Sequence, residues 1–269
     1  MNKEEIIGLS FDEKVKFIEK NNCEAIDILV NDTDPDVRLR ILDNFMYDKN
    51  LDIFVHNSNW HVRRAVPSYW RNNYLDKFVH DPDCRVRQRV AQYGRNSDLD
   101  ILVKDSDWHV RLVVALHYRD KDLDILVNDS NDAIRNVVAE HGRNKDLDIL
   151  VSDANFNIRE VVASFGRDQD LDILVHDQNY IVRRMVAYSG KYKYLDILVN
   201  DPEPCVRIAV AKMRRDKDLD ILVYDECTDV RIAVAEIGRD KDIDILSNDK
   251  EVIVRVSYNQ NHINNITLL

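Results

Sequence analysis

The stretch that decides the fold is LDILVNDSNDAIRNVVAEHGRNKD, residues 123–146. The same layout recurs along the chain, and a fixed period of 24 residues indicates stacked repeats that form a solenoid. Ten units follow one another, and only the first is one residue longer. They begin at Ile26, Leu51, Leu75, Leu99, Leu123, Leu147, Leu171, Leu195, Leu219 and Ile243.

Each unit is predicted to hold two helices. Residues 124–127 predict one short α or 3₁₀ turn. Asp129 is predicted to be the N-cap of a second helix of about twelve residues, because a carboxylate accepts the unpaired N–H groups of a first turn. Gly142 is predicted to end that helix in the left-handed conformation. The second helix carries an apolar stripe with the spacing i, i+3, i+4, i+7: Ile134, Val137, Val138 and His141.

This pattern predicts an all-α solenoid of ten two-helix repeats. A helical cap at residues 1–25 precedes the solenoid at residues 26–265, and residues 266–269 remain from a C-terminal cap. The form D-x-D-W-H-V-R-x-x-V-A at residues 105–115 resembles the leucine-rich repeat variant family, and more loosely HEAT-type solenoids. The resemblance implies a curved right-handed superhelix that binds other macromolecules. Some members are described with an N-terminal iron–sulfur cluster, but Cys23 stands alone here, so no cofactor is predicted.

Composition excludes several classes of protein. Among 269 residues, 45% are hydrophobic and 32% are charged, as in a folded soluble domain. No apolar run approaches the roughly 18 residues of a membrane-spanning helix, and the first residues lack a signal-peptide pattern. The net charge of −11 opposes wrapping of nucleic acid by the whole chain. Four cysteines without CxxC spacing predict a reduced cytoplasmic protein without a metal site.

Charged columns recur once in every unit. One column of aspartates and one of arginines are predicted to pair within or between neighbouring units, although the arginines could instead form a phosphate-binding track. A second basic column follows the longer helix and is expected to pair with the aspartates before each LDIL segment, which are also expected to cap the first helix. The first two columns are Asp27, Asp52, Asp76, Asp100, Asp124, Asp148, Asp172, Asp196, Asp220 and Asp244, with Arg38, Arg63, Arg87, Arg111, Arg135, Arg159, Arg183, Arg207, Arg231 and Arg255.

One stretch breaks the acidic pattern. Residues 60–95 carry 8 basic and 3 acidic groups, a balance of +5, whereas residues 1–59 carry −6 and residues 96–269 carry −10. All three tryptophans lie in or beside this stretch, and arginine with aromatic rings is typical of protein hot spots and of base-stacking grooves. Trp60 and Trp108 could equally pack between units. The candidate binding residues are Trp60, His61, Arg64, Trp70, Arg85, Arg89, Trp108, His109 and Leu112.

No nucleophile elbow, phosphate loop or HExxH motif is present, so no catalytic residue and no enzyme activity are predicted. The leading hypothesis is a non-enzymatic scaffold that recognises a protein or peptide on the concave face of the solenoid. One alternative is nucleic-acid binding through residues 60–119, and a weaker one is a HEAT-like DNA glycosylase, whose catalytic aspartate has no match here. The variable helix-face residues are Arg64, Gln88, Leu112, Asn136, Glu160 and Arg184.

Overall fold

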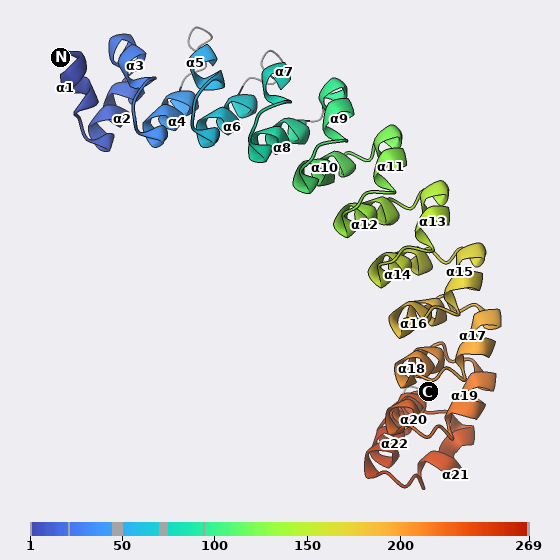
Figure 1. Cartoon of the computed structure of the whole chain (residues 1–269). Helices are drawn as coiled ribbons and strands as arrows, with labels where there is room; N and C mark the ends of the chain where they lie inside the picture. Colours follow the sequence, from blue (N-terminus) through green and yellow to red (C-terminus); the bar gives the residue numbers. More distant parts are fainter. Residues whose placement is uncertain (1, 21, 45–50, 70–74, 94, 268–269) are drawn as a thin grey trace. The chain divides into compact units, whose positions relative to one another are not determined.

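The computed structural model describes residues 2–20, 22–44, 51–69, 75–93 and 95–267. Every regular element among these residues is a helix, which confirms the all-α prediction (Figure 1). The chain forms two compact units, Met1–Val137 and Val138–Leu269, and each is described by itself.

In the first unit, α1 (Lys3–Ile7) and α2 (Phe11–Glu19) precede the repeats. Short and long helices then alternate, with the short helices along one side and the long helices along the other (Figure 1). The short helices are α3 (Cys23–Leu29), α5 (Leu51–Val55), α7 (Leu75–Phe78), α9 (Asn96–Leu102) and α11 (Asp120–Leu126). The long helices are α4 (Pro35–Asn44), α6 (Trp60–Tyr69), α8 (Cys84–Tyr93), α10 (Trp108–Ala115) and α12 (Asp132–His141), whose last residues belong to the second unit.

The second unit repeats the alternation, and its consecutive long helices pack against one another. Its short helices are α13 (Asn144–Leu150), α15 (Asp168–Leu174), α17 (Tyr192–Leu198), α19 (Asp216–Leu222), and the 3₁₀ helix η1 (Asp240–Asp242) with α21 (Ile243–Leu246). Its long helices are α14 (Phe156–Ser164), α16 (Tyr180–Tyr188), α18 (Pro204–Lys212), α20 (Thr228–Ala235) and α22 (Val252–Thr267). The prediction of a solenoid of two-helix repeats is therefore confirmed.

The core of each repeat is built from the same few apolar positions. In residues 123–146, Leu123 and Leu126 of the short helix and Val138 of the long helix are all buried. His141 is exposed, so the buried stripe ends one turn earlier than its spacing predicts. Because one repeat has an apolar face on each side, its neighbours supply the rest of the core.

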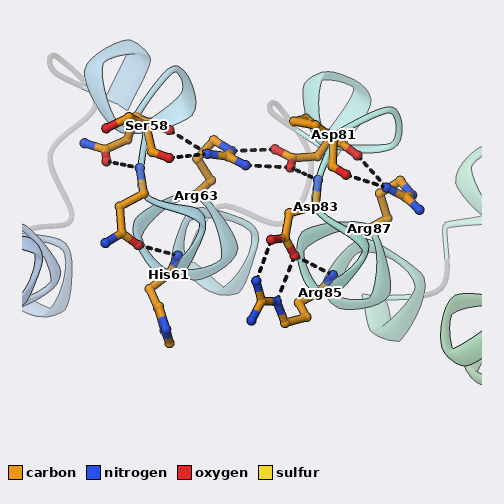
Figure 2. Close-up of polar contacts among 10 residues, drawn as sticks. Ser58, His61, Arg63, Asp81, Asp83, Arg85 and Arg87 are labelled. Carbon is orange, nitrogen blue, oxygen red and sulfur yellow. Dashed lines mark hydrogen bonds and ion pairs between the residues drawn. The ribbon is translucent and has the colours of Figure 1, made fainter. Parts of the chain in front are cut away.

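Arginine–aspartate pairs connect neighbouring repeats, as the recurring columns predict. Arg63 on α6 donates from Nε and NH2 to the carboxylate of Asp81 in the next repeat, at 2.7 and 2.9 Å (Figure 2). Its NH1 donates to the carbonyl of Asn57 in its own repeat at 2.7 Å. The same forks join Arg87–Asp105 and Arg111–Asp129 in the first unit, and Arg159–Asp177, Arg183–Asp201, Arg207–Asp225 and Arg231–Asp249 in the second. The aspartate column differs from the predicted one, since Asp81 takes the place expected of Asp76.

The predicted N-cap at Asp129 is wrong. The Asp129 carboxylate accepts the fork of Arg111 and the backbone N–H of Asn131 at 2.8 Å, so it shapes the turn before the helix. Asn131 accepts the N–H of Ala133 at 2.9 Å, and α12 begins at Asp132. Asn131 is therefore the capping residue.

The second basic column forms a separate ladder beside the short helices. Arg119 lies at the N-cap position of α11 and donates to the carboxylate of Asp122 at 2.6 and 2.8 Å. Its NH2 also lies 2.9 Å from Asp100. The predicted pairing is confirmed, but the predicted capping role is wrong, because Asp122 lies inside the first turn and binds the arginine instead of the helix N–H groups.

Gly142 ends α12 with a φ of 75°, as predicted for a left-handed C-terminal residue. Gly166, Gly190 and Gly238 also have positive φ values. Tyr118 and Arg214 hold the equivalent positions in their repeats with φ values of 53° and 57°. The stacking of neighbouring repeats thus imposes this conformation even where a side chain makes it costly.

One junction lacks its carboxylate. Asn57 stands where the other repeats have aspartate, and its Oδ1 accepts the N–H of Asn59 at 2.9 Å. The arginine that should meet it is Arg38, whose Nε is buried and has no hydrogen-bond partner in the described part of the chain. At the other side of the first repeat, which contains Arg38, Lys14 of α2 lies 2.9 Å from the Asp32 carboxylate and so forms the first ion pair of the ladder.

Candidate functional site

The candidate residues come from the first turns of the long helices. Trp60, Cys84 and Trp108 are the first residues of α6, α8 and α10. A polar cap precedes each helix, and its carboxylate or amide oxygen accepts an N–H of the first turn, as Asp107 does from His109 at 2.9 Å. The first two side chains of successive long helices therefore form a row at the same end of the helices.

Trp60 lies within a closed cluster. The ring of His61 stacks on it with centroids 3.5 Å apart, and the guanidinium carbon of Arg85 lies 3.3 Å from its centroid. Two groups so close to the centre of one ring must occupy its opposite faces. Arg85 is held there by Asp83, which accepts from its Nε at 2.9 Å and its NH2 at 2.7 Å (Figure 2). These bonds to Arg85 keep the pKa of Asp83 below its usual value, so the carboxylate remains charged.

Trp108 has a histidine on one face and no guanidinium over it among the described residues. The ring of His109 stacks on it with centroids 3.7 Å apart, and Trp108 keeps 37% of its surface exposed. The residue equivalent to Arg85 in the next repeat is Ala133, and within the described residues no cation lies over the Trp108 ring. Packing between neighbouring repeats therefore accounts for half-buried Trp60 more fully than for Trp108.

A shallow open hollow separates the starts of α8 and α10. Its volume is about 430 Å³, and its walls come from Pro82, Asp83, Cys84, Arg85, Arg87, Ser106 and Asp107. Burial, together with a hydrogen bond to Asp107, raises the pKa of the Cys84 thiol. That thiol is consequently protonated at neutral pH and a poor nucleophile. Across the described ranges, no group of three or more His, Cys, Asp or Glu side chains is placed to hold a metal ion.

The other candidates lie farther along the long helices. Arg64 is exposed and has no ion-pair partner in the described part of the chain. Leu112 is half-buried at the equivalent position of α10. Arg89 donates to Gln92 at 2.7 Å, and its guanidinium carbon lies 5.4 Å from the Tyr93 ring. Trp70 lies outside the described residues.

Sequence reasoning missed the residues that organise these rings. Asp83 and Asp107 stand one position before their helices. They hold the same repeat position as the asparagine caps, and this shared position could have identified them from the sequence. Ala133 was missed because its importance lies in what it lacks compared with Arg85. That comparison requires knowing that the second residue of one long helix covers the first residue of the preceding one.

Comparison with known proteins supports the fold. A solved structure described as a leucine-rich repeat variant with a novel repetitive structural motif is similar to this chain, with a TM-score of 0.66 and 25% identity. The similarity covers 77% of this chain and 88% of that one. The predicted resemblance to the leucine-rich repeat variant is thereby confirmed at the level of structure. No protein-family model and no curated protein matches the sequence.

Among the helices of the described residues, none combines the length and the apolar character needed to cross a bilayer.

Proposed function

We propose that this protein is a non-enzymatic scaffold that binds a protein or peptide through the exposed side of its long helices. We call this side the long-helix face; in the first unit it includes Arg64, Gln88 and Leu112, and in the second unit Glu160 and Arg184. The observation that carries the proposal is that these positions, of which Arg64 is exposed and the other four are half-buried, differ from repeat to repeat, whereas the recurring charged side chains pair with one another.

The arginine–aspartate ladders hold most of the recurring charge. Arg111 and Asp129 lie 2.6 Å apart with little exposure, so their opposite charges cancel for any approaching ligand. Raised pKa values of the ladder arginines, for which the carboxylate hydrogen bonds are the main favourable cause, mark the same pairing. A phosphate track along this column would require breaking those pairs. Recognition is therefore assigned to the variable side chains.

Exposed apolar side chains support a protein partner on this face. Trp108 at the start of α10 and its C-cap Leu116 are 37% and 50% exposed. In the second unit, Tyr180 and Tyr188 on α16 are 40% and 44% exposed. Aromatic and aliphatic anchors on a rigid element are the usual source of binding energy at protein interfaces. The proposal includes a reducing cytoplasmic location, in keeping with the free thiols of Cys84, Cys205 and Cys227.

Position-resolved photocrosslinking tests this proposal. A photoreactive phenylalanine analogue would replace half-buried Leu112 or Arg184 on the long-helix face, and the more exposed Ile125 or Ile173 on the short helices as controls. We expect a partner to be captured from the first pair and not from the second. Capture from the short-helix positions alone would overturn the proposal.

Nucleic acid is the second candidate partner, favoured by exposed Arg64 beside Trp60. It predicts that tryptophan fluorescence changes on titration with oligonucleotides and that the affinity falls by at least about tenfold between 50 and 200 mM salt. Arg64→Ala should reduce that salt dependence. A flat response at both salt concentrations would remove this candidate.

A further inference from the structure

The chain contains a template for how a cation binds its aromatic row. At Trp60 the guanidinium of Arg85 lies 3.3 Å from the ring centroid, and Asp83 holds it from the side. A guanidinium lies favourably over a tryptophan face because its charge is attracted by the electron-rich ring. This arrangement comes from two residues of one repeat, Asp83 and Arg85, and the first residue of the long helix in the repeat before it.

Four long helices begin with an aromatic residue, and the equivalent covering position differs at each. Arg85 covers Trp60. In the second unit, the positions equivalent to Arg85 hold Ile181 after Phe156 and Cys205 after Tyr180. After Trp108 the equivalent position holds Ala133, which is itself exposed and has no side chain beyond Cβ. Of these four described rings, only the tryptophan of α10 faces a position with no such side chain.

We infer that the face of Trp108 opposite His109 is a subsite for an arginine side chain of a bound peptide, placed as Arg85 is placed on Trp60. This inference rests on the proposed protein-binding function and names one side chain that the scaffold recognises. The peptide supplies from outside the group that the repeat itself supplies at Trp60.

The surroundings of Trp108 suit a guanidinium better than a phosphate. Asn131 replaces Asp83 in this repeat, and its Oδ1 accepts the N–H of Ala133 at 2.9 Å, so no carboxylate holds the guanidinium here and the attraction comes from the ring and the surrounding charge. Residues 96–137 carry 5 basic and 9 acidic groups, and the balance is −2 when Arg87 and Arg95, which pair with Asp105 and Asp98, are counted with them. This balance attracts a cationic peptide and opposes a nucleic-acid backbone. His109 stacks on the covered face and keeps the ring in place.

The probe is a peptide of about ten glycines and serines with one central arginine, compared with the same peptide carrying citrulline. Citrulline keeps the shape of arginine but has no charge. Binding to the full chain is followed by the indole N–H signals in two-dimensional NMR spectra, assigned with Trp→Phe variants. We expect the arginine peptide to shift the Trp108 signal saturably, and the citrulline peptide to bind about two- to fivefold more weakly.

Two matched variants exchange the two sites. Ala133→Arg supplies an internal guanidinium and should abolish the response of Trp108, and folding is preserved because Ala133 is exposed. Arg85→Ala uncovers Trp60 and should make its signal respond to the same peptide. Equal binding of both peptides, or an unchanged Trp108 response in Ala133→Arg, would overturn the inference.

The two proposals fail separately. If a partner captured from the long-helix face binds Ala133→Arg as tightly as the unmodified protein, the scaffold function stands and the arginine subsite is overturned. If crosslinks arise only from the short helices, the proposed function is overturned even if the arginine peptide shifts Trp108.

Discussion

Asn57→Asp is expected to stabilise the junction between the first and second repeats. Asn57 uses its Oδ1 to accept the N–H of Asn59 at 2.9 Å, just as Asp81 accepts the N–H of Asp83 at 2.9 Å. The Asn57 amide nitrogen therefore takes the place of the second carboxylate oxygen. This amide nitrogen is a hydrogen-bond donor, as is the guanidinium of Arg38, whose Nε is buried without a partner among the described residues.

The size of the effect follows from the next junction. There, Asp81 accepts two hydrogen bonds from Arg63 at 2.7 and 2.9 Å, and the two side chains are only 4% and 12% exposed. An unsatisfied buried donor costs about 1–3 kcal/mol, and a hydrogen bond to a charged group contributes a similar amount. Since the new carboxylate must also lose its water, we expect a net gain of about 1–3 kcal/mol.

Amide hydrogen exchange measures this gain locally, which matters because repeat arrays can unfold in parts. A gain of about 1–3 kcal/mol slows exchange in α4 and α6 by about 5- to 150-fold wherever opening of this junction controls exchange. Asp81→Asn is the reciprocal control and should destabilise its own junction by a similar amount. The gain must also disappear in an Arg38→Met background, because it acts through that side chain. Unchanged or faster exchange in Asn57→Asp would refute the pairing argument.

Three further results are expected from thermal or denaturant unfolding. Gly166→Ala should cost about 0.5–1.5 kcal/mol from its φ of 66° alone. Gly142→Ala should cost up to about 1 kcal/mol more, because its Cβ would lie 2.4 Å from the exposed Phe165 ring, which must move aside; equal costs would contradict this. Tyr118→Gly should stabilise by about 0.5 kcal/mol, since φ there is 53°, and a loss would show that the side chain outweighs its strain. Burial opposes ionisation of Asp177, but hydrogen bonds from Arg159 and a backbone N–H keep its pKa below the usual value. The stabilisation from Asp177 is therefore complete above about pH 4 and is lost as the pH falls through that lowered pKa. Stability that does not change down to about pH 2 would contradict this.

The period of 24 residues was sufficient to predict the architecture, because each repeat must bury the same Leu and Val positions against its neighbours. The capping residue could not be assigned in the same way. Asp129 and Asn131 are both good N-caps by residue type, and the choice between them depends on Arg111 of the preceding repeat. The ladder pairs from Arg63–Asp81 onward are separated by 18 residues. This separation identifies which aspartate each arginine binds, whereas the period of 24 residues alone does not.

The candidate site was predictable in composition but not in geometry. The sequence predicts arginine and tryptophan together at the start of the long helices, and the structure brings Arg85 onto Trp60. The sequence does not predict which ring stays open. That depends on the second residue of one long helix covering the first residue of the preceding long helix. The same offset gives Trp108 an alanine neighbour and an exposed face.

Hydrogen exchange of the protein with and without its captured partner is the most direct test of the central claim, that the long-helix face is the functional surface. We expect slower exchange upon binding in α8, α10 and α12, with exchange in α9 and α11 unchanged. Protection confined to the short helices would contradict it.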